Sequence, residues 1–157
     1  MGVGADVAQW GLNLLTSGAV AWFTANWTYR RAAQQRRLDQ IDTALEDYAT
    51  AGQAYWRESG AIPVDERAIL QCLDRLSSRV DSYFSNTRRN DTQLEIDLAI
   101  DNLHKLITGD DAHGNAFKSP ERVADKNRPG LIRSDAAAIR GTIGALPLST
   151  KMPFGFF

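Results

Sequence analysis

The chain has 157 residues, of which 43% are hydrophobic and 24% are charged, and its formal net charge is −1. This length allows one compact domain and little more, and the composition is ordinary for a folded protein. A near-neutral charge gives no basis for nucleic acid as the main partner, so no direct DNA binding is expected. The single cysteine, Cys72, excludes an internal disulfide and fits a reducing compartment for most of the chain.

The chain begins with a long run that carries no charge. Residues 7–29 contain no Asp, Glu, Lys or Arg, while Asp6 precedes the run and Arg30 and Arg31 follow it. A helix needs about 20 residues to cross the hydrocarbon core of a bilayer. The run therefore predicts an N-terminal transmembrane helix over residues 1–29.

Aromatic and basic residues near the ends of this run predict how it is anchored. Trp10 and Trp27 lie where indole rings favour the membrane–water interface, and Arg30 and Arg31 follow directly. By the positive-inside rule, the arginines hold the C-terminal side in the cytoplasm. The expected location is the bacterial inner membrane, with a single pass, a short N-terminus outside and a cytoplasmic C-terminal domain.

Except for Asn26, the polar side chains of the run gather on one side of the predicted helix, within an arc of about 120°. A lone helix with such a polar face needs partners in lipid, which predicts a homo-oligomer whose polar faces meet one another or line a wet pore. The simpler alternative is a helix–helix contact, with hydroxyls bonded to their own backbone. The predicted pore-lining or oligomer-interface residues are Gln9, Asn13, Thr16, Ser17, Thr24 and Thr28, and the predicted helix-packing residues are Gly11, Gly18 and Ala25.

Two other interpretations of the same run stay open. A cleaved signal peptide requires a positive n-region, but only Asp6 stands before the apolar residues. A helix buried in the core of the protein itself would fit the modest hydrophobicity of the run.

The helix is expected to continue beyond the membrane as a stalk over residues 30–57, because this segment contains no proline. Glu58-Ser59-Gly60 and Pro63 are expected to end it. Apolar residues recur in the segment at alternating spacings of three and four, a pattern typical of coiled coils that subunits can also share. These residues are Leu38, Ile41, Leu45, Tyr48, Gly52 and Tyr55.

Residues 58–146 predict a small cytoplasmic helical bundle, so the fold class is all-α. A second helix is expected from Asp65, a third from Asp91 or Thr92 with Gly109 just past its end, and the last from Ser134-Asp135 to Leu146. Asn86–Asn90 predicts a turn, Ser119-Pro120-Glu121 a further helix start, Pro129-Gly130 an interruption, and residues 147–157 an irregular tail.

The apolar faces of these helices follow from periodicity. Ile96 and Ile100 alternate locally with polar residues, but a strand is rejected there because no partner strand is expected. The second helix is expected to bury Ile69, Leu73, Leu76, Val80 and Tyr83 alongside Leu70 and Phe84, and the third to bury Leu94, Leu98, Leu103, Leu106 and Ile107.

No set of residues predicts an enzyme, a cofactor or a metal centre. His104 lies near Asp101 and Lys105, which fits a surface pair better than an acid–base set. Asp110-Asp111 with His113 could ligate a divalent cation, but adjacent aspartates beside glycine are more typical of turns. No catalytic, cofactor-binding or metal-binding residue is therefore assigned.

One enzymatic alternative is kept. Helical ribonucleases of the HEPN type use an arginine, a polar residue and then a histidine about five residues later. Arg89-Asn90 supplies the first half, but no histidine follows until His104. A HEPN-like ribonuclease would therefore need a composite site, assembled across a fold or subunit boundary.

Several segments, together with the polar-faced membrane helix, resemble small single-pass helical membrane effectors of bacterial phage defence. Examples of these effectors are the ancillary membrane protein of type VI-B CRISPR systems and the membrane effector of Hailong systems. The segments are Leu38-Asp39-Gln40-Ile41, Cys72-Leu73-Asp74-Arg75-Leu76-Ser77-Ser78-Arg79, Leu106-Ile107-Thr108-Gly109-Asp110-Asp111 and Ser119-Pro120-Glu121-Arg122.

The resemblance implies a homo-oligomeric pore, an ion channel that depolarises or permeabilises the inner membrane during infection. The expected partners are membrane lipid, further copies of the chain, and an activating nucleotide, oligonucleotide or partner protein. A non-conducting membrane-tethered adaptor or regulatory subunit is the main alternative. The resemblance transfers no catalytic residue, because the histidine of a HEPN pair is missing.

Overall fold

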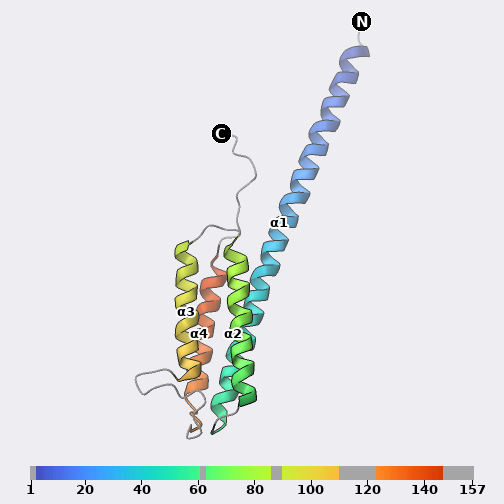
Figure 1. Ribbon diagram of the computed structural model, residues 1–157. Helices are drawn as coiled ribbons and strands as arrows, with labels where there is room; N and C mark the ends of the chain where they lie inside the picture. The colour runs from blue at the N-terminus through green and yellow to red at the C-terminus, as the bar shows by residue number, and fades with distance from the viewer. Residues whose placement is uncertain (1–2, 61–62, 86–89, 110–122, 147–157) are drawn as a thin grey trace. The chain divides into compact units, whose positions relative to one another are not determined.

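The computed structural model describes residues 3–60, 63–85, 90–109 and 123–146, without the side chains of residues 3–16, 63–64 and 90. These ranges contain four α-helices and no strand, which confirms the all-α prediction (Figure 1). The helices are α1 (Val3–Arg57), α2 (Pro63–Phe84), α3 (Asn90–Thr108) and α4 (Arg128–Gly144).

The chain divides into two units. Among the described residues, the first unit consists of residues 3–35 of α1, and the second runs from Arg36 to Leu146 and is called the bundle below. Residues 36–57, which the sequence assigned to a stalk, therefore supply the first helix of the bundle. Arg79 of α2 donates a hydrogen bond to Gln40 of α1, and Arg140 of α4 forms ion pairs with α1.

The coiled-coil-like row of α1 packs inside its own chain. Leu45, Tyr48 and Tyr55 are completely buried, and Ile41 and Leu38 are nearly so. The glycine of the row, Gly52, lies against Ile107 of α3. This row therefore forms the centre of the bundle, and in the bundle it has no free surface to share with a second subunit.

The buried face of α3 differs from the predicted one. Leu94 and Leu98 are 60% and 56% exposed, whereas Ile96 and Ile100, which the sequence had suggested only as a local alternation, are buried. The spacing 96, 100, 103 and 107 follows one side of a helix, and Leu94 and Leu98 lie on the opposite side. In α2 the predicted face is buried, except that Leu70 is 40% exposed and Leu73 is half-buried.

The last helix starts earlier in the structure than the sequence predicts. Pro129-Gly130 was expected to interrupt the chain, but both residues lie in the first turn of α4, which begins at Arg128 rather than Ser134. Proline is well suited to this position, because the first N–H groups of a helix have no partner within it. The helix ends at Gly144, and Leu146 is buried just beyond it.

Glycine terminates two helices as the sequence predicts. Gly60 follows α1 with φ 85°, and Gly109 follows α3 with φ 69°. Both are left-handed conformations that residues with a Cβ avoid. Residues 86–89, the Ser119-Pro120-Glu121 helix start and the tail at 147–157 lie outside the described residues.

Candidate functional site

The first unit of α1 exposes large apolar and aromatic side chains. Val20, Trp22 and Tyr29 are 65%, 63% and 73% exposed, respectively. The rings of Trp22 and Phe23 meet edge to face with their centroids 5.0 Å apart. Val20 lies on the opposite side of the helix from Trp22 and Tyr29, so this segment exposes apolar side chains on more than one side. We call residues 17–31, whose side chains are all at least partly exposed, the exposed segment.

The polar face within the exposed segment satisfies part of its hydrogen bonding internally. Thr24 Oγ1 donates to the carbonyl oxygen of Val20 at 2.8 Å, and Thr28 Oγ1 donates to those of Thr24 and Ala25 at 2.9 Å. Ser17, Thr24 and Thr28 remain exposed. These hydroxyls therefore tolerate an apolar environment better than free hydroxyls would.

The remaining predicted residues of this helix divide into two groups. Ala25 is exposed, and a Cβ added at Gly18 would meet no atom within 4 Å, so the packing line is open where its side chains are described. The side chains of Trp10, Gln9, Asn13 and Thr16, and any contact of Gly11, lie outside the description, although the backbone there is helical.

Two residues of the predicted membrane anchor, Trp27 and Arg31, contact each other at the end of the exposed segment. The guanidinium carbon of Arg31 lies 5.3 Å from the centroid of the Trp27 ring, within the range of a cation–π interaction. Arg30 and Arg31 are both exposed. No helix in the described part of the chain combines the length and the hydropathy of a membrane span.

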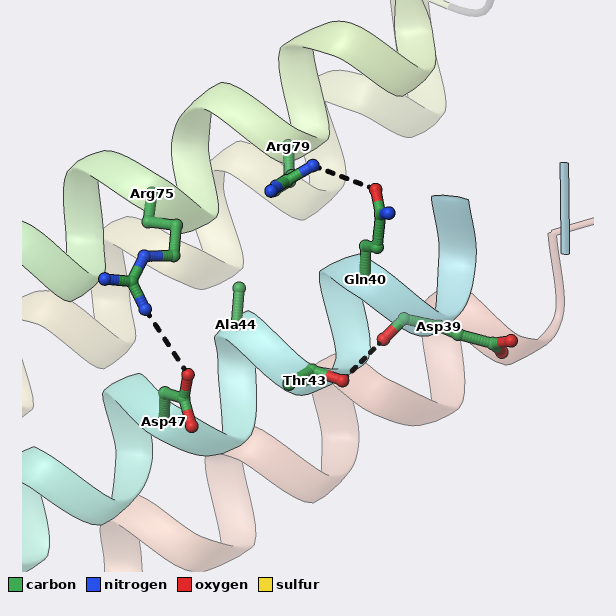
Figure 2. A pocket seen from close by; sticks show the side chains of 7 residues that line it. All are labelled: Asp39, Gln40, Thr43, Ala44, Asp47, Arg75 and Arg79. Atoms are coloured by element: carbon green, nitrogen blue, oxygen red, sulfur yellow. Dashed lines mark hydrogen bonds and ion pairs between the residues drawn. The ribbon is translucent and has the colours of Figure 1, made fainter. Parts of the chain in front are cut away.

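A shallow groove of about 210 Å³ lies between α1 and α2 in the bundle (Figure 2). Arg75 pairs with Asp47 at 3.6 Å, and Arg79 Nη1 donates to Gln40 Oε1 at 2.9 Å. The side chains that line the groove are Asp39, Gln40, Thr43, Ala44, Asp47, Arg75 and Arg79. Figure 2 shows these polar groups bridging the two helices, and the lining contains no cysteine, serine or histidine.

The histidine kept for a composite ribonuclease site has a structural partner. His104 Nδ1 lies 2.6 Å from the hydroxyl of Tyr48, and the two rings stack. Burial raises the pKa of the Tyr48 phenol above its ordinary value, with a smaller contribution from Cys72, so the phenol stays protonated at neutral pH. Asp101, considered as a partner of the histidine, pairs with Lys105 at 2.7 Å, and Arg89 lies outside the described residues.

A second group of polar contacts links the C-terminal end of α3 to the end of α1 and the start of α4. Trp56 Nε1 donates to the carbonyl oxygen of Ile107 at 2.7 Å, and Arg128 Nη1 donates to that of Leu106 at 3.3 Å. The guanidinium of Arg128 also lies over the Trp56 ring at 4.1 Å. These donors satisfy carbonyls in the last turn of α3, which have no partner within their own helix.

Sequence reasoning missed the tertiary hydrogen bonds of the bundle. Tyr55 Oη donates to the buried carboxylate of Glu66 at 2.7 Å, and Tyr48 reaches His104. Helical spacing placed both tyrosines on the apolar row, but it could not give their hydrogen-bond partners on other helices.

Among the described residues, no buried side-chain nitrogen or oxygen lacks a hydrogen-bond partner, and no three His, Cys, Asp or Glu side chains gather closely enough to hold a metal ion. The pair Asp110-Asp111 and His113 lie outside the described residues. Comparison of this chain with protein-family models, with curated proteins and with solved structures finds no match.

Proposed function

We propose that the chain is a homo-oligomeric membrane protein, in which residues 7–29 of several copies assemble in the bilayer around a pore. The observation that carries this proposal is the exposed segment of α1, where Val20, Trp22 and Tyr29 are more than half exposed. A helix that is charge-free over residues 7–29 and exposes such side chains lowers its free energy by burying them in lipid or against other copies.

The polar face supports assembly rather than insertion of a single copy. Amides such as those of Gln9 and Asn13 lower the mean hydropathy of the run, and hydrocarbon offers them no partner. When several copies turn these side chains toward a common axis, the lipid meets the other side of each helix, which is apolar except for Asn26. The packing line at Gly11, Gly18 and Ala25 permits close approach of neighbouring helices.

The bundle is proposed to be the cytoplasmic domain that receives the activating signal. An activating nucleotide, oligonucleotide or partner protein would open the pore only if it bound the open state more tightly than the closed state. The role in bacterial antiviral defence, by depolarising the inner membrane, rests on the sequence resemblance to small membrane effectors.

The test compares ion flux through liposomes that carry the full chain or one of two matched variants. Asn13→Leu removes an amide from the polar face, and Asn26→Leu makes the same change away from that face. We expect Asn13→Leu to reduce flux at least tenfold and Asn26→Leu to leave it near the wild-type value, with both variants resisting extraction by alkali. Equal flux through the two variants contradicts the pore.

One observation favours a second candidate, a non-conducting membrane-tethered adaptor. The Thr24 and Thr28 hydroxyls are bonded to their own helix, so this part of the polar face needs no water-filled lumen. The number of copies separates the two proposals, because two helices cannot enclose a lumen and a ring of several can.

A further inference from the structure

The end of the exposed segment combines aromatic rings and arginines, and no acidic residue lies near them in the sequence. Tyr29 is 73% exposed, and Arg30 and Arg31 are exposed beside it. Residues 7–38 contain no Asp or Glu, so neither arginine has a carboxylate within one turn of its own helix. The contact between Arg31 and Trp27 keeps that guanidinium close to the indole ring.

We propose that Trp27, Tyr29, Arg30 and Arg31 bind the phosphate groups of anionic phospholipids. A guanidinium presents a planar set of donors that matches two phosphate oxygens, and its charge is retained at every physiological pH. Successive residues of a helix point about 100° apart, so Arg30 and Arg31 reach two different headgroups rather than one. Arg30 lies on the outer side of the helix, whereas Trp27 and Arg31 lie on the side of Gln9 and Asn13 and reach headgroups at the mouth of the assembly. Tyrosine and tryptophan favour the same depth, because each has an apolar ring and a polar tip.

The order of side chains along α1 favours a lipid over a nucleic acid. The charge-free apolar residues Val20, Trp22 and Phe23 come first, the aromatic residues Trp27 and Tyr29 follow, and the arginines come last. A phospholipid layer has the same order, with acyl chains first, then the interfacial region and then the phosphates. A nucleic acid could pair with the arginines, but it would leave the apolar side chains exposed to water. This inference rests on the proposed membrane insertion of residues 7–29.

The experiment uses tryptophan fluorescence of the full chain in vesicles of phosphatidylcholine and phosphatidylglycerol, with bromine placed on the acyl chains of one lipid at a time. Bromine quenches nearby tryptophans, so the ratio of the two quenching values reports which lipid surrounds the helix. Each arginine near an anionic surface contributes about a fivefold preference, so two contribute up to about 30-fold. We expect clear enrichment of phosphatidylglycerol around the wild type.

Two double variants with equal charge change make the test specific. Arg30→Gln with Arg31→Gln is expected to bring the quenching ratio close to that of the bulk lipid mixture. Arg67→Gln with Arg133→Gln, which alters exposed arginines of α2 and α4, is expected to keep the enrichment. If both double variants lost the enrichment of phosphatidylglycerol equally, the net charge of the protein would explain the enrichment, and the proposal would be wrong.

The remaining outcomes separate this inference from the proposed function. Equal quenching of the wild type by both lipids overturns the lipid preference while leaving membrane insertion intact, and no quenching by either lipid refutes insertion itself. If excess inorganic phosphate abolished the preference for phosphatidylglycerol, the arginines would form a general anion site, and the proposed specificity for a phospholipid would be wrong. Binding of an RNA oligonucleotide through Arg30 and Arg31, without any preference for phosphatidylglycerol, would also contradict the proposed phospholipid binding.

Discussion

At the scale of single residues, the bundle depends on a close approach between α1 and α3. A Cβ added to Gly52 would lie 2.6 Å from Cγ1 and 2.8 Å from Cδ1 of Ile107, whose side chain is fully buried. Real Cβ atoms do not approach another carbon so closely, so a larger residue would push the two helices apart. Glycine is therefore kept inside a helix in spite of its unfavourable helix propensity.

We expect Gly52→Ala to lower the free energy of unfolding of the bundle by about 1–3 kcal/mol, because overpacking a well-packed core is costly. Gly141→Ala is the control, since a Cβ there meets no atom within 4 Å. That change should stabilise α4 by roughly 0.5–1 kcal/mol through helix propensity alone. Urea denaturation of both variants measures the difference, and stabilisation by Gly52→Ala would contradict the close approach.

The segment before α4 contains an acid-sensitive contact. The Asp125 carboxylate accepts hydrogen bonds from the backbone N–H groups of Asn127 and Arg128, at 2.9 and 3.3 Å, and it pairs with the Arg128 guanidinium. These contacts, first of all the Asn127 N–H, hold the pKa of Asp125 below its usual range. A lowered pKa in the folded state means that the ionised carboxylate stabilises the fold.

This stabilisation is fully present above the pKa of the unfolded chain, about 3.9, and is lost as the pH falls through the lower folded value. We therefore expect Asp125→Asn to lower the urea midpoint at pH 7, and to lower it less at pH 3. Asp135→Asn, on the exposed side of α4, is the matched control. An equal loss from Asp125→Asn at both pH values would show that the charge is not involved.

At the scale of elements, α3 shows how far periodicity can be trusted. Its helix and its terminal Gly109 follow from the sequence, but its orientation does not, because isoleucines and leucines occupy both sides. The side with Ile96, Ile100, Leu103 and Ile107 faces the core, and it leaves Leu94 and Leu98 exposed. Side-chain pattern alone could not choose between two apolar sides, since the choice depends on the surfaces of the other helices.

We expect Ile100→Ala to destabilise the bundle by about 2–4 kcal/mol, since it removes buried methyl groups and leaves a cavity. Leu98→Ala, on the opposite side of the same helix, should change stability by no more than about 0.5 kcal/mol. Thermal or urea unfolding of the two variants, monitored by circular dichroism, tests which side of α3 faces the core. Similar losses in both would mean that Leu98 is buried as well.

The boundaries of the elements were predictable to a different degree. Glycine after α1 and α3 correctly predicts where these helices end, whereas the predicted interruption at Pro129 is wrong, because Pro129 lies in the first turn of α4. Proline fits both a break and a helix start, and only the surrounding packing decides between them. The candidate site was predictable only as a pattern, because the helical period gives its polar face but not the number of chains that share it.

At the scale of the whole molecule, the two units differ in how far they bury their large apolar and aromatic side chains. The bundle buries its aromatic residues and links its helices through Tyr48–His104, Tyr55–Glu66 and Trp56–Arg128. The exposed segment leaves Val20, Trp22 and Tyr29 on the surface of a single chain. A folded bundle and a helix with exposed aromatic side chains are the two parts that the proposed membrane-bound oligomer requires.

The number of copies in the lipid-embedded assembly tests this account most directly. The full chain, extracted from membranes and reconstituted into lipid nanodiscs, can be counted by native mass and imaged as single particles. The account predicts a closed ring of more than two copies with an axial hole between the segments at residues 7–29. A homogeneous monomer that remains in the aqueous phase would contradict it.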